Sequence, residues 1–237
     1  MIKAVCFDLD GTLLPLDIDV FCKQYFSMLA AKMAPHGYEP KAFIGAILSG
    51  TKEMYQNDGK RTNEQVFWDH FCSVFGERAR ADEPIFAEFY ETEFDRARAA
   101  CGFDADAAPS VKKIQQMGLR VAIATNPFFP RIATYKRLSW AGIPPETVEF
   151  FTTYEDAHFS KPNPDYYREV AARLGLAPEE CLMVGNDVGE DMVAAKVGMQ
   201  VFLLTNDYLI NKKGEDISTY PHGGFAELLA HIANLQK

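Results

Sequence analysis

The sequence predicts an α/β fold in which helices cover both faces of a parallel sheet and a smaller all-helical block is inserted near the start. From about residue 102 onward, short apolar runs typical of buried strands alternate with helical patterns, which favours right-handed crossovers between parallel strands. Between residues 17 and 100 the apolar residues recur at helical spacing instead. We therefore expect a core domain of residues 1–16 and 101–237 and an inserted helical domain of residues 17–100.

The composition is that of an ordinary globular protein. Its 237 residues, 48% of them hydrophobic, are enough for one large domain or for a core with an insert. The formal net charge of -9 disfavours nucleic acid or an anionic membrane as the partner. It does not disfavour a small phosphorylated metabolite, because local cations can outweigh the global charge.

Five scattered cysteines without a Cys-x-x-Cys pair indicate reduced structural thiols. The sequence shows no signal-peptide pattern and no apolar run long enough to span a bilayer. We therefore expect a cytoplasmic protein, either a monomer or a homodimer.

The first strand ends in two carboxylates. Residues 3–14, Lys-Ala-Val-Cys-Phe-Asp-Leu-Asp-Gly-Thr-Leu-Leu, predict a buried strand followed by a tight turn. In an extended chain Asp8 and Asp10 would share one face. Because a crevice lies beyond the carboxyl ends of parallel strands, this pair predicts a hard metal with oxygen ligands, or a nucleophile beside a general acid. A solvated acidic turn is the plain structural alternative.

The inserted block is predicted to hold four helical segments. The first carries residues 20–33, and a second, shorter helix stops near Gly50. A third begins with a cap at Thr62 and closes at Gly76, and Pro84 opens the last. The many aromatic residues in this block favour a core, or an interface with the main domain, over a cofactor site.

The remaining chain alternates between the two patterns. The expected helices are 108–117, 132–141, 163–174, 190–197 and 224–235, and the expected strands are 119–124, 150–153, 181–184 and 200–204. Residues 207–220 are polar and predict a surface loop.

Two of the predicted strands are followed by groups suited to anionic oxygen. Thr125 and Asn126 offer a hydroxyl, an amide and the N–H groups of a turn, although an ordinary Thr-Asn-Pro turn is the alternative. Lys161 stands before Pro162 and is held out of a helix, where a solvated surface lysine is the alternative.

A third loop, after the strand ending at Val184, carries three acids. The run Gly185-Asn-Asp-Val-Gly-Glu-Asp191 passes through a glycine turn into a predicted helix. Acids at this place also stabilise a helix start, so simple capping is the alternative.

These four segments, in this order, resemble the signatures of the haloacid dehalogenase-like (HAD) hydrolases, mostly phosphatases and phosphomutases. They are Phe-Asp-Leu-Asp-Gly-Thr-Leu at 7–13, Thr125, the Lys-Pro-x-Pro run from Lys161, and the acidic loop. The resemblance covers residues 3–15 and about 102–205. It implies a Rossmann-like core and an alpha-helical cap inserted after the first motif.

The resemblance also implies roles for residues of this chain. Asp8 would be the nucleophile and Asp10 the general acid and base, while Thr125, Asn126 and Lys161 would bind the phosphoryl group. The implied ligands of Mg²⁺ are Asp8, Asp10 through its carbonyl, Asp187, and Asp191 as a ligand or a nearby acceptor. The family usually has Asp directly after the glycine, where this chain has Asn186, so the choice between Asn186 and Asp187 stays open.

The implied activity is Mg²⁺-dependent hydrolysis of a small-molecule phosphomonoester through an aspartyl-phosphate on Asp8. A phosphomutase of the same family would keep the same residues. A 2-haloacid dehalogenase is disfavoured, because such members typically lack Asp10 and the metal-binding acids. A non-catalytic binding protein is disfavoured because each catalytic position carries a chemically competent residue.

Overall fold

The computed structural model describes residues 1–237 and is built around one five-stranded sheet in the order β2-β1-β3-β4-β5. All neighbouring strands are parallel. The strands are β1 (Ala4–Phe7), β2 (Arg120–Ile123), β3 (Cys181–Gly185), β4 (Gln200–Leu204) and β5 (His222–Gly223). The predicted α/β fold is confirmed, and β1 lies inside the sheet, between β2 and β3.

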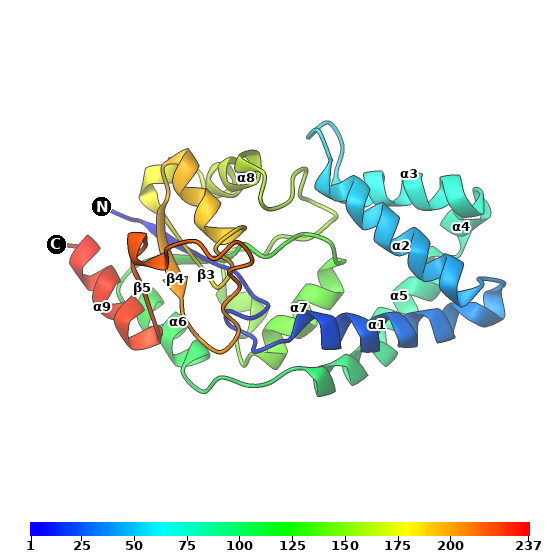
Figure 1. Ribbon diagram of the computed structural model, residues 1–237, viewed down its shortest axis with the longest axis horizontal. Coiled ribbons are helices and arrows are strands. Elements are labelled where there is room, and N and C mark those ends of the chain that lie inside the picture. Colours follow the sequence, from blue (N-terminus) through cyan, green and yellow to red (C-terminus); the bar gives the residue numbers. More distant parts are fainter.

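The strand side chains alternate between two apolar layers. Val5 and Phe7 pack with helices on one face of the sheet, whereas Ala4 and Cys6 pack with helix α8 and its neighbours on the other. This alternation follows from the two-residue period of a strand, and it requires helices on both faces. Figure 1 shows α6 and α9 on one side of the sheet and α8 on the other.

The helices follow the predicted order. The α-helices are α1 (Ile18–Met33), α2 (Pro40–Tyr55), α3 (Asn63–Phe75), α4 (Arg78–Ala81), α5 (Glu83–Glu91), α6 (Ala107–Gln116), α7 (Arg131–Trp140), α8 (Pro164–Leu174) and α9 (Phe225–Leu235). The 3-10 helices are η1 (Ala34–His36), η2 (Glu93–Ala100), η3 (Pro145–Thr147), η4 (Pro178–Glu180), η5 (Asp191–Val197) and η6 (Ile217–Thr219).

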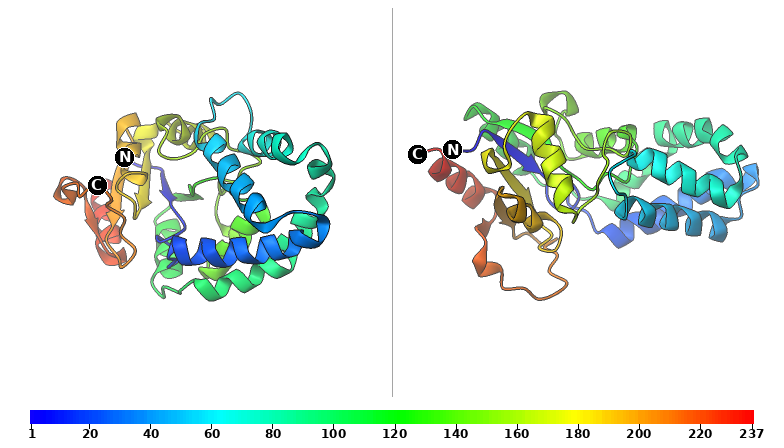
Figure 2. Two further views of the ribbon diagram at one scale, coloured as in Figure 1. Left: turned by 45° about the vertical axis from the view of Figure 1, so that its right-hand side comes forward. Right: turned by 90° about the horizontal axis from the view of Figure 1, so that it is seen from above.

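Helices α1 to α5 form a lobe beside the sheet, which we call the helical lobe (Figures 1 and 2). Aromatic side chains fill the interior of this lobe and are continuous with the apolar layer on the Val5 and Phe7 face of the sheet. Phe94 of η2, for example, stacks on Trp140 of α7 with ring centroids 5.3 Å apart. The aromatic residues therefore serve both as the core of this lobe and as its contact with the rest of the molecule.

Two kinds of contact join the helical lobe to the sheet-bearing part. The chain leaves and returns at neighbouring points, where Leu16 and Cys101 form an antiparallel bridge and Gly102 N donates to Pro15 O at 2.7 Å. The second contact is made by the buried Asn63, the first residue of α3. Because both contacts lie near the carboxyl end of β1, they bring the lobe over that end of the sheet.

Asn63 holds the start of α3 against two loops of the sheet-bearing part. Its Nδ2 lies 3.4 Å from Pro127 O, 3.3 Å from Phe159 O and 3.2 Å from Ser160 Oγ, and its side chain is fully buried. Asn57 Nδ2 in turn donates to Asn63 Oδ1 at 2.9 Å. The amide is thus satisfied on both sides, as a buried polar group requires.

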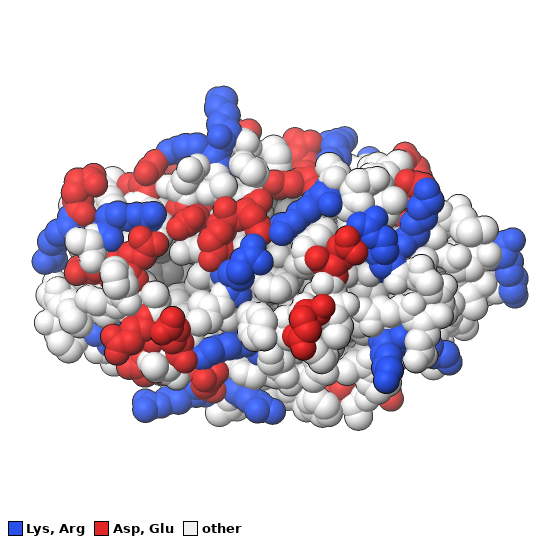
Figure 3. Space-filling view, turned by 180° about the vertical axis from the view of Figure 1, so that it is seen from behind, with Lys and Arg blue, Asp and Glu red and all other residues white.

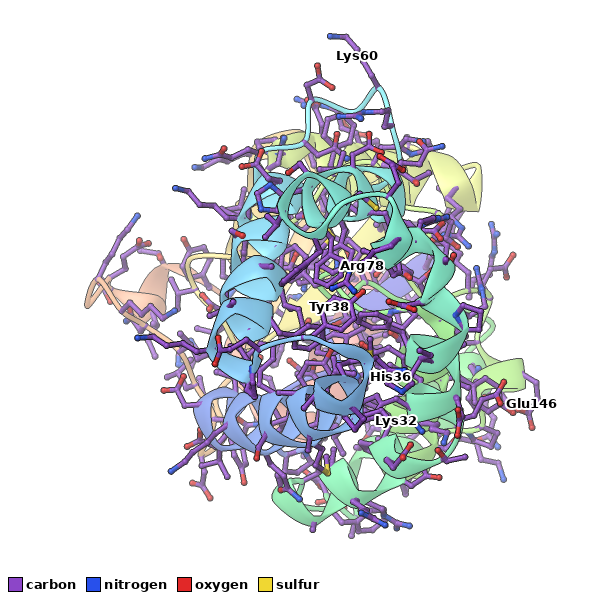
Figure 4. The ribbon with its side chains drawn as sticks, turned by 90° about the vertical axis from the view of Figure 1, so that its right-hand side faces the viewer. Lys32, His36, Tyr38, Lys60, Arg78 and Glu146 are labelled. Carbon is purple, nitrogen blue, oxygen red and sulfur yellow. The ribbon has the colours of Figure 1, made fainter.

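Exposed cations lie at both ends of the helical lobe (Figure 4). Lys60 projects outward from the loop between α2 and α3, at the end of the lobe that contacts the sheet-bearing part. The Arg78 guanidinium lies 5.4 Å from the centre of the Tyr38 ring, a cation–π contact that covers the buried tyrosine.

Three expectations from the sequence are wrong in detail. The second helix does not stop at Gly50 but continues to Tyr55, because Gly50 is where α3 crosses closely: a Cβ there would lie 2.8 Å from Phe67 Cδ2. The expected strand at 150–153 is reduced to one bridge, between Ile123 and Phe151. The expected helix at 190–197 is the 3-10 helix η5.

The expected surface loop at 207–220 has a structural role. Ile210 forms a parallel bridge with Asp187, and Tyr208 O accepts from Asn186 Nδ2 at 2.6 Å. No helix of the molecule is both long enough and apolar enough to cross a membrane.

We predict that Asn63→Ala lowers the free energy of unfolding by about 1–3 kcal/mol, because it leaves buried acceptors of two loops without their donor. Urea unfolding followed by circular dichroism measures the change. The exposed Asn234→Ala is the control and should shift stability by no more than about 0.5 kcal/mol. Equal stability of Asn63→Ala and the unmodified protein would contradict the docking role of Asn63.

Candidate active site

The end of β1 is shaped by a tight turn at Gly11. Asp8 N still donates to Val184 O of β3 at 2.8 Å, and Leu9 O then accepts from the amides of Leu13 and Leu14. Gly11 has a φ of 81°, and a Cβ on it would lie 2.4 Å from Asn186 Nδ2. Only glycine permits both this backbone conformation and this close approach, which brings the loop after β1 against the loop after β3.

Lys161 lies at the centre of the site. Its side chain is 1% exposed, and its Nζ lies 2.8 Å from Asp8 Oδ1 and 2.6 Å from Asp191 Oδ1. Burial alone would lower the pKa of Lys161, but Asp191 and Asp8 outweigh burial and raise it well above its usual value. The lysine is therefore a fixed cation between two carboxylates.

Asp191 is held as a partner of this lysine. Gly185 makes room for it, because a Cβ on Gly185 would lie 2.0 Å from Asp191 Oδ2. That oxygen accepts from Asp187 N at 3.0 Å. Burial raises the pKa of Asp191 to about 6, while Lys161 lowers it. Asp191 is thus a second carboxylate that balances the lysine.

One hydroxyl connects Asp8 with the loop after β3. The Oγ1 of the buried Thr12 lies 3.1 Å from Asp8 Oδ2 and 2.8 Å from Asn186 Oδ1. The Thr12 hydroxyl has one proton for two acceptors, Asp8 Oδ2 and Asn186 Oδ1. The two acceptor oxygens therefore lie close together and share a single donor.

The Asp187 side chain does not join the Thr12 hydroxyl and its two acceptors. Its Oδ1 accepts from Gly189 N at 2.7 Å and from Glu190 N at 3.1 Å, which closes its own turn. Asn186, rather than Asp187, therefore shares the Thr12 hydroxyl with Asp8. No group of three or more His, Cys, Asp or Glu side chains is arranged to hold a metal ion.

The oxygen donors that do converge still suit Mg²⁺. Asp8 supplies a carboxylate and Asn186 an amide oxygen, and the main-chain carbonyl of the same turn can add a third oxygen. Hard divalent cations take such oxygen sets, in which not every ligand has to be an acid.

Asn126 ties three loops together. Its Oδ1 accepts from Lys161 N at 3.1 Å, and its Nδ2 donates to Glu190 Oε2 at 3.0 Å. The neighbouring Thr125 is buried, and its carbonyl accepts from Thr152 Oγ1 at 2.6 Å and from Tyr166 OH at 2.8 Å. The strand end that carries Thr125 is thus rigidly held beside Lys161.

Asp10 has a partner that the sequence interpretation missed. It forms an ion pair with the Arg137 guanidinium, which comes from α7 and is buried. Burial raises the pKa of Asp10, while Arg137 lowers it and Asp8 raises it. Arg137 could have been noticed from its spacing, since it stands four residues from Ala133 and from Ala141 on the buried face of its helix.

Two further groups at the site were not anticipated. Burial raises the pKa of Glu190 to about 7, while Lys161 lowers it. Tyr55, at the end of α2, packs on Phe128 with ring centroids 4.5 Å apart, and burial together with the nearby Glu190 raises its pKa. Nothing in the local sequence distinguishes Tyr55 from an ordinary helix residue.

A depression of the surface lies away from these residues. It is on the helical lobe between α1, α5 and η2, and Lys32 there pairs with Glu88 and Glu93. None of the site residues lines it. The buried ionisable groups therefore converge at the sheet edge and not at this depression.

Comparisons with known proteins identify the family of the chain. A family model for haloacid dehalogenase-like hydrolases matches residues 2–198. Hexitol phosphatase A of Escherichia coli (strain K12) is 29% identical over 184 residues, which cover 77% of this chain and 73% of that protein. Glyceraldehyde 3-phosphate phosphatase of Methanocaldococcus jannaschii is 26% identical over 241 residues, with 100% of both chains covered.

Solved structures share the fold. An HAD phosphatase from Thermococcus onnurineus aligns with a TM-score of 0.59 and 20% identity over 98% of each chain. An HAD family hydrolase from Deinococcus radiodurans R1, with bound phosphate and sodium, aligns with a TM-score of 0.56 and 21% identity over 98% of this chain and 96% of that one.

The chain belongs to the haloacid dehalogenase-like hydrolase family. It is an enzyme of the phosphatase type within that family.

We predict that Lys161→Met lowers the free energy of unfolding by about 3–5 kcal/mol at pH 7, because two buried carboxylates lose their shared cation. The loss should be smaller at pH 5. The pKa of Asp191 is already raised to about 6 and would rise further, so the folded variant binds more protons than the unfolded chain between these pH values. Its stability therefore falls as the pH rises.

Urea titrations at pH 5 and pH 7 measure this difference. Lys3→Met is the matched control, since Lys3 forms a surface ion pair with Glu180 and its loss should cost at most about 1 kcal/mol at either pH. A Lys161→Met variant as stable as the unmodified protein at pH 7 would contradict the central role of this cation.

Proposed function

We propose that this phosphatase hydrolyses a small phosphomonoester through an aspartyl-phosphate on Asp8. The observation that carries the proposal is the buried ammonium of Lys161, which lies 2.8 Å from Asp8 Oδ1. The Thr12 hydroxyl lies by the other carboxylate oxygen. A carboxylate oriented on both sides and compensated by a fixed cation is suited to attack an anionic phosphoryl group.

The proposed reaction has two steps. An Asp8 oxygen attacks phosphorus and the bond to the ester oxygen breaks, while Asp10 gives its proton to the departing oxygen. Asp10 then takes a proton from a water molecule whose oxygen attacks the same phosphorus. This releases inorganic phosphate and restores the Asp8 carboxylate.

Three groups are proposed to bind the phosphoryl oxygens. They are the Thr125 hydroxyl, the Asn126 main-chain amide and the Lys161 ammonium. The support is that Asn126 links the loops carrying the other two by its bond to Lys161 N. Donors held in advance at fixed positions stabilise the charge of a phosphoryl transition state without having to reorganise.

Mg²⁺ is the proposed cofactor, held by Asp8, the Asp10 carbonyl and the loop after β3. When bound, it would offset the repulsion between the nucleophile and the phosphate. From the sequence, Asp187 and Asp191 are the candidate ligands in this loop. The bonds of Asp187 to its own turn and of Asp191 to Lys161 favour Asn186 Oδ1 as the direct ligand instead.

The helical lobe is proposed to act as a cap, with residues 17–100 as its domain. Its adjacent points of exit and return, at Leu16 and Cys101, suit a hinge. Tyr55 is proposed to be the lobe's contact with the leaving group, since its ring packs on Phe128, two residues after Asn126. A cap in this position would exclude water and select the ester.

The proposed substrate class is a small phosphorylated metabolite such as a sugar phosphate. The names of the two relatives, for hexitol phosphates and glyceraldehyde 3-phosphate, support this class. Lys and Arg are interspersed with Asp and Glu on the face shown in Figure 3, so the attraction for phosphate is proposed to be local, from Lys161. A phosphomutase would use the same residues, but it would need a bisphosphate and leave phosphate on its product.

We predict that inorganic phosphate is released from a panel of small phosphomonoesters with Mg²⁺ and not with EDTA. Asp8→Asn should lower the rate by at least about 10³-fold, because it removes the nucleophile. Malachite-green detection of phosphate measures the release, and the exposed Asp216→Asn serves as the control that keeps full activity. Undiminished release by folded Asp8→Asn would contradict the proposed mechanism.

We predict that the Mg²⁺ requirement identifies the ligand in the loop after β3. Asn186→Asp should lower the Mg²⁺ concentration for half-maximal activity, because it adds a charge among the ligands. Asp187→Asn should change that concentration little, since an asparagine oxygen can still accept from the amides of Gly189 and Glu190. The opposite pattern, with Asp187→Asn raising the requirement about 10-fold or more, would assign the metal to Asp187.

A further inference from the structure

Arg137 is a fully buried arginine that none of the proposed catalytic roles uses. Its side chain is 1% exposed and comes from α7, outside the four loops that carry the site. An arginine stays charged in proteins, so it cannot avoid the cost of burial by losing a proton. Its position therefore depends on the groups around it.

Those groups are few. One terminal nitrogen forms the ion pair with Asp10 Oδ2, and the other donates to Thr134 Oγ1 at 3.2 Å. The guanidinium carbon lies 4.4 Å from the centre of the Phe129 ring, and Nε has no partner. Asp10 is thus the only carboxylate that balances this buried charge.

The two oxygens of Asp10 are in different situations. Oδ2 is bound by Arg137, whereas Oδ1 is buried and has no hydrogen-bond partner. A buried carboxyl oxygen without a partner is costly, and such groups in a native structure commonly have a functional reason. The side chain as a whole is 18% exposed, although Oδ1 itself is buried.

We propose that Arg137 is a positioning residue that anchors Asp10 through Oδ2 and leaves Oδ1 free to exchange the proton with the ester oxygen. This inference rests on the proposed function, in which Asp10 is the acid for the leaving group. In the first step the proton passes from Oδ1 to the departing oxygen as the bond to phosphorus breaks. In the second step Oδ1 takes a proton from the attacking water.

The helical lobe keeps the anchor in place. Phe129 covers one face of the guanidinium, and its ring also lies 5.4 Å from Tyr25 and 6.2 Å from Phe21, both in α1. Arg137 is therefore held between α1, which follows the first motif, and the turn that carries Asp10. A shift of the guanidinium would require repacking these rings.

Esters with different leaving groups test the proposal. An alkyl phosphate needs its oxygen protonated, whereas the phenolate of 4-nitrophenyl phosphate leaves without an acid. Arg137→Met should therefore lower kcat for the best alkyl phosphate by about 10–100-fold more than kcat for 4-nitrophenyl phosphate. Arg131→Met is the matched control from the same helix, because Arg131 forms a surface ion pair with Asp156, and it should affect both esters alike or not at all.

Combining variants tests whether Arg137 acts through Asp10. In an Asp10→Asn background, Arg137→Met should cause no further loss on the alkyl ester, because the group that it positions is already disabled. Arg137→Lys keeps the charge and loses the planar fork, so it should show a smaller loss with the same selectivity. Where Arg137→Met does not fold, Arg137→Lys decides by the same comparison.

The outcomes separate this inference from the proposed function. Equal losses on both esters in folded Arg137 variants, or additive losses with Asp10→Asn, would overturn the positioning role while the phosphatase mechanism stands. Asp8-independent cleavage, or no cleavage of any ester by the unmodified enzyme, would overturn the proposed function and this inference with it.

Discussion

The arrangement at the sheet edge depends on one buried cation. Lys161 lies between Asp8 and Asp191, and each distance is that of a charge-assisted hydrogen bond. The desolvation of an ammonium is offset only when such partners are fixed, which explains why the surrounding backbone is so restricted. Gly185 lacks a side chain where Asp191 fits, and Gly11 lacks one where Asn186 fits. Three of the four loops therefore meet around one buried charge, and Asn126 joins the fourth to them through the hydrogen bond from Lys161 N. The parallel sheet supplies the common edge at which they meet.

The parts of the fold that could be predicted are those governed by local periodicity. Alternating strand and helix patterns are enough to predict a doubly covered parallel sheet, and glycine at a helix end predicts a stop. The same rule was wrong at Gly50, because this glycine leaves room for Phe67 of α3 to pack closely. That is a tertiary contact, which the local sequence around Gly50 does not reveal. The strand expected at 150–153 was wrong for a related reason. Aromatic residues and threonines permit a strand, but pairing beyond Phe151 has to be supplied by the rest of the fold.

The site shows the same division. Asp8 could be located because its motif follows a strand, and Lys161 because of its Lys-Pro-x-Pro run, and the structure brings the two side chains together. The choice between Asn186 and Asp187 could not be made from sequence, since it depends on which side chain turns back to close its own loop. Arg137 and Asn63 escaped notice because each is a polar residue on the buried face of a helix. Their significance lies in partners far away in the chain, at Asp10 and at the loop before Lys161.

Charge balance also explains why a divalent cation suits this site. Three carboxylates, Asp8, Asp10 and Asp191, face two buried cations, Lys161 and Arg137. Each cation is already engaged by a carboxylate, so a phosphate group would enter a site that is not positive overall. Neighbouring like charges in a poorly solvated site either shift protons or require a further cation. An oxygen-ligated divalent ion beside Asp8 would supply that positive charge without displacing Lys161. Arg137 would not supply it, because its guanidinium is bound to Asp10 Oδ2 and holds that carboxyl group instead of binding phosphate.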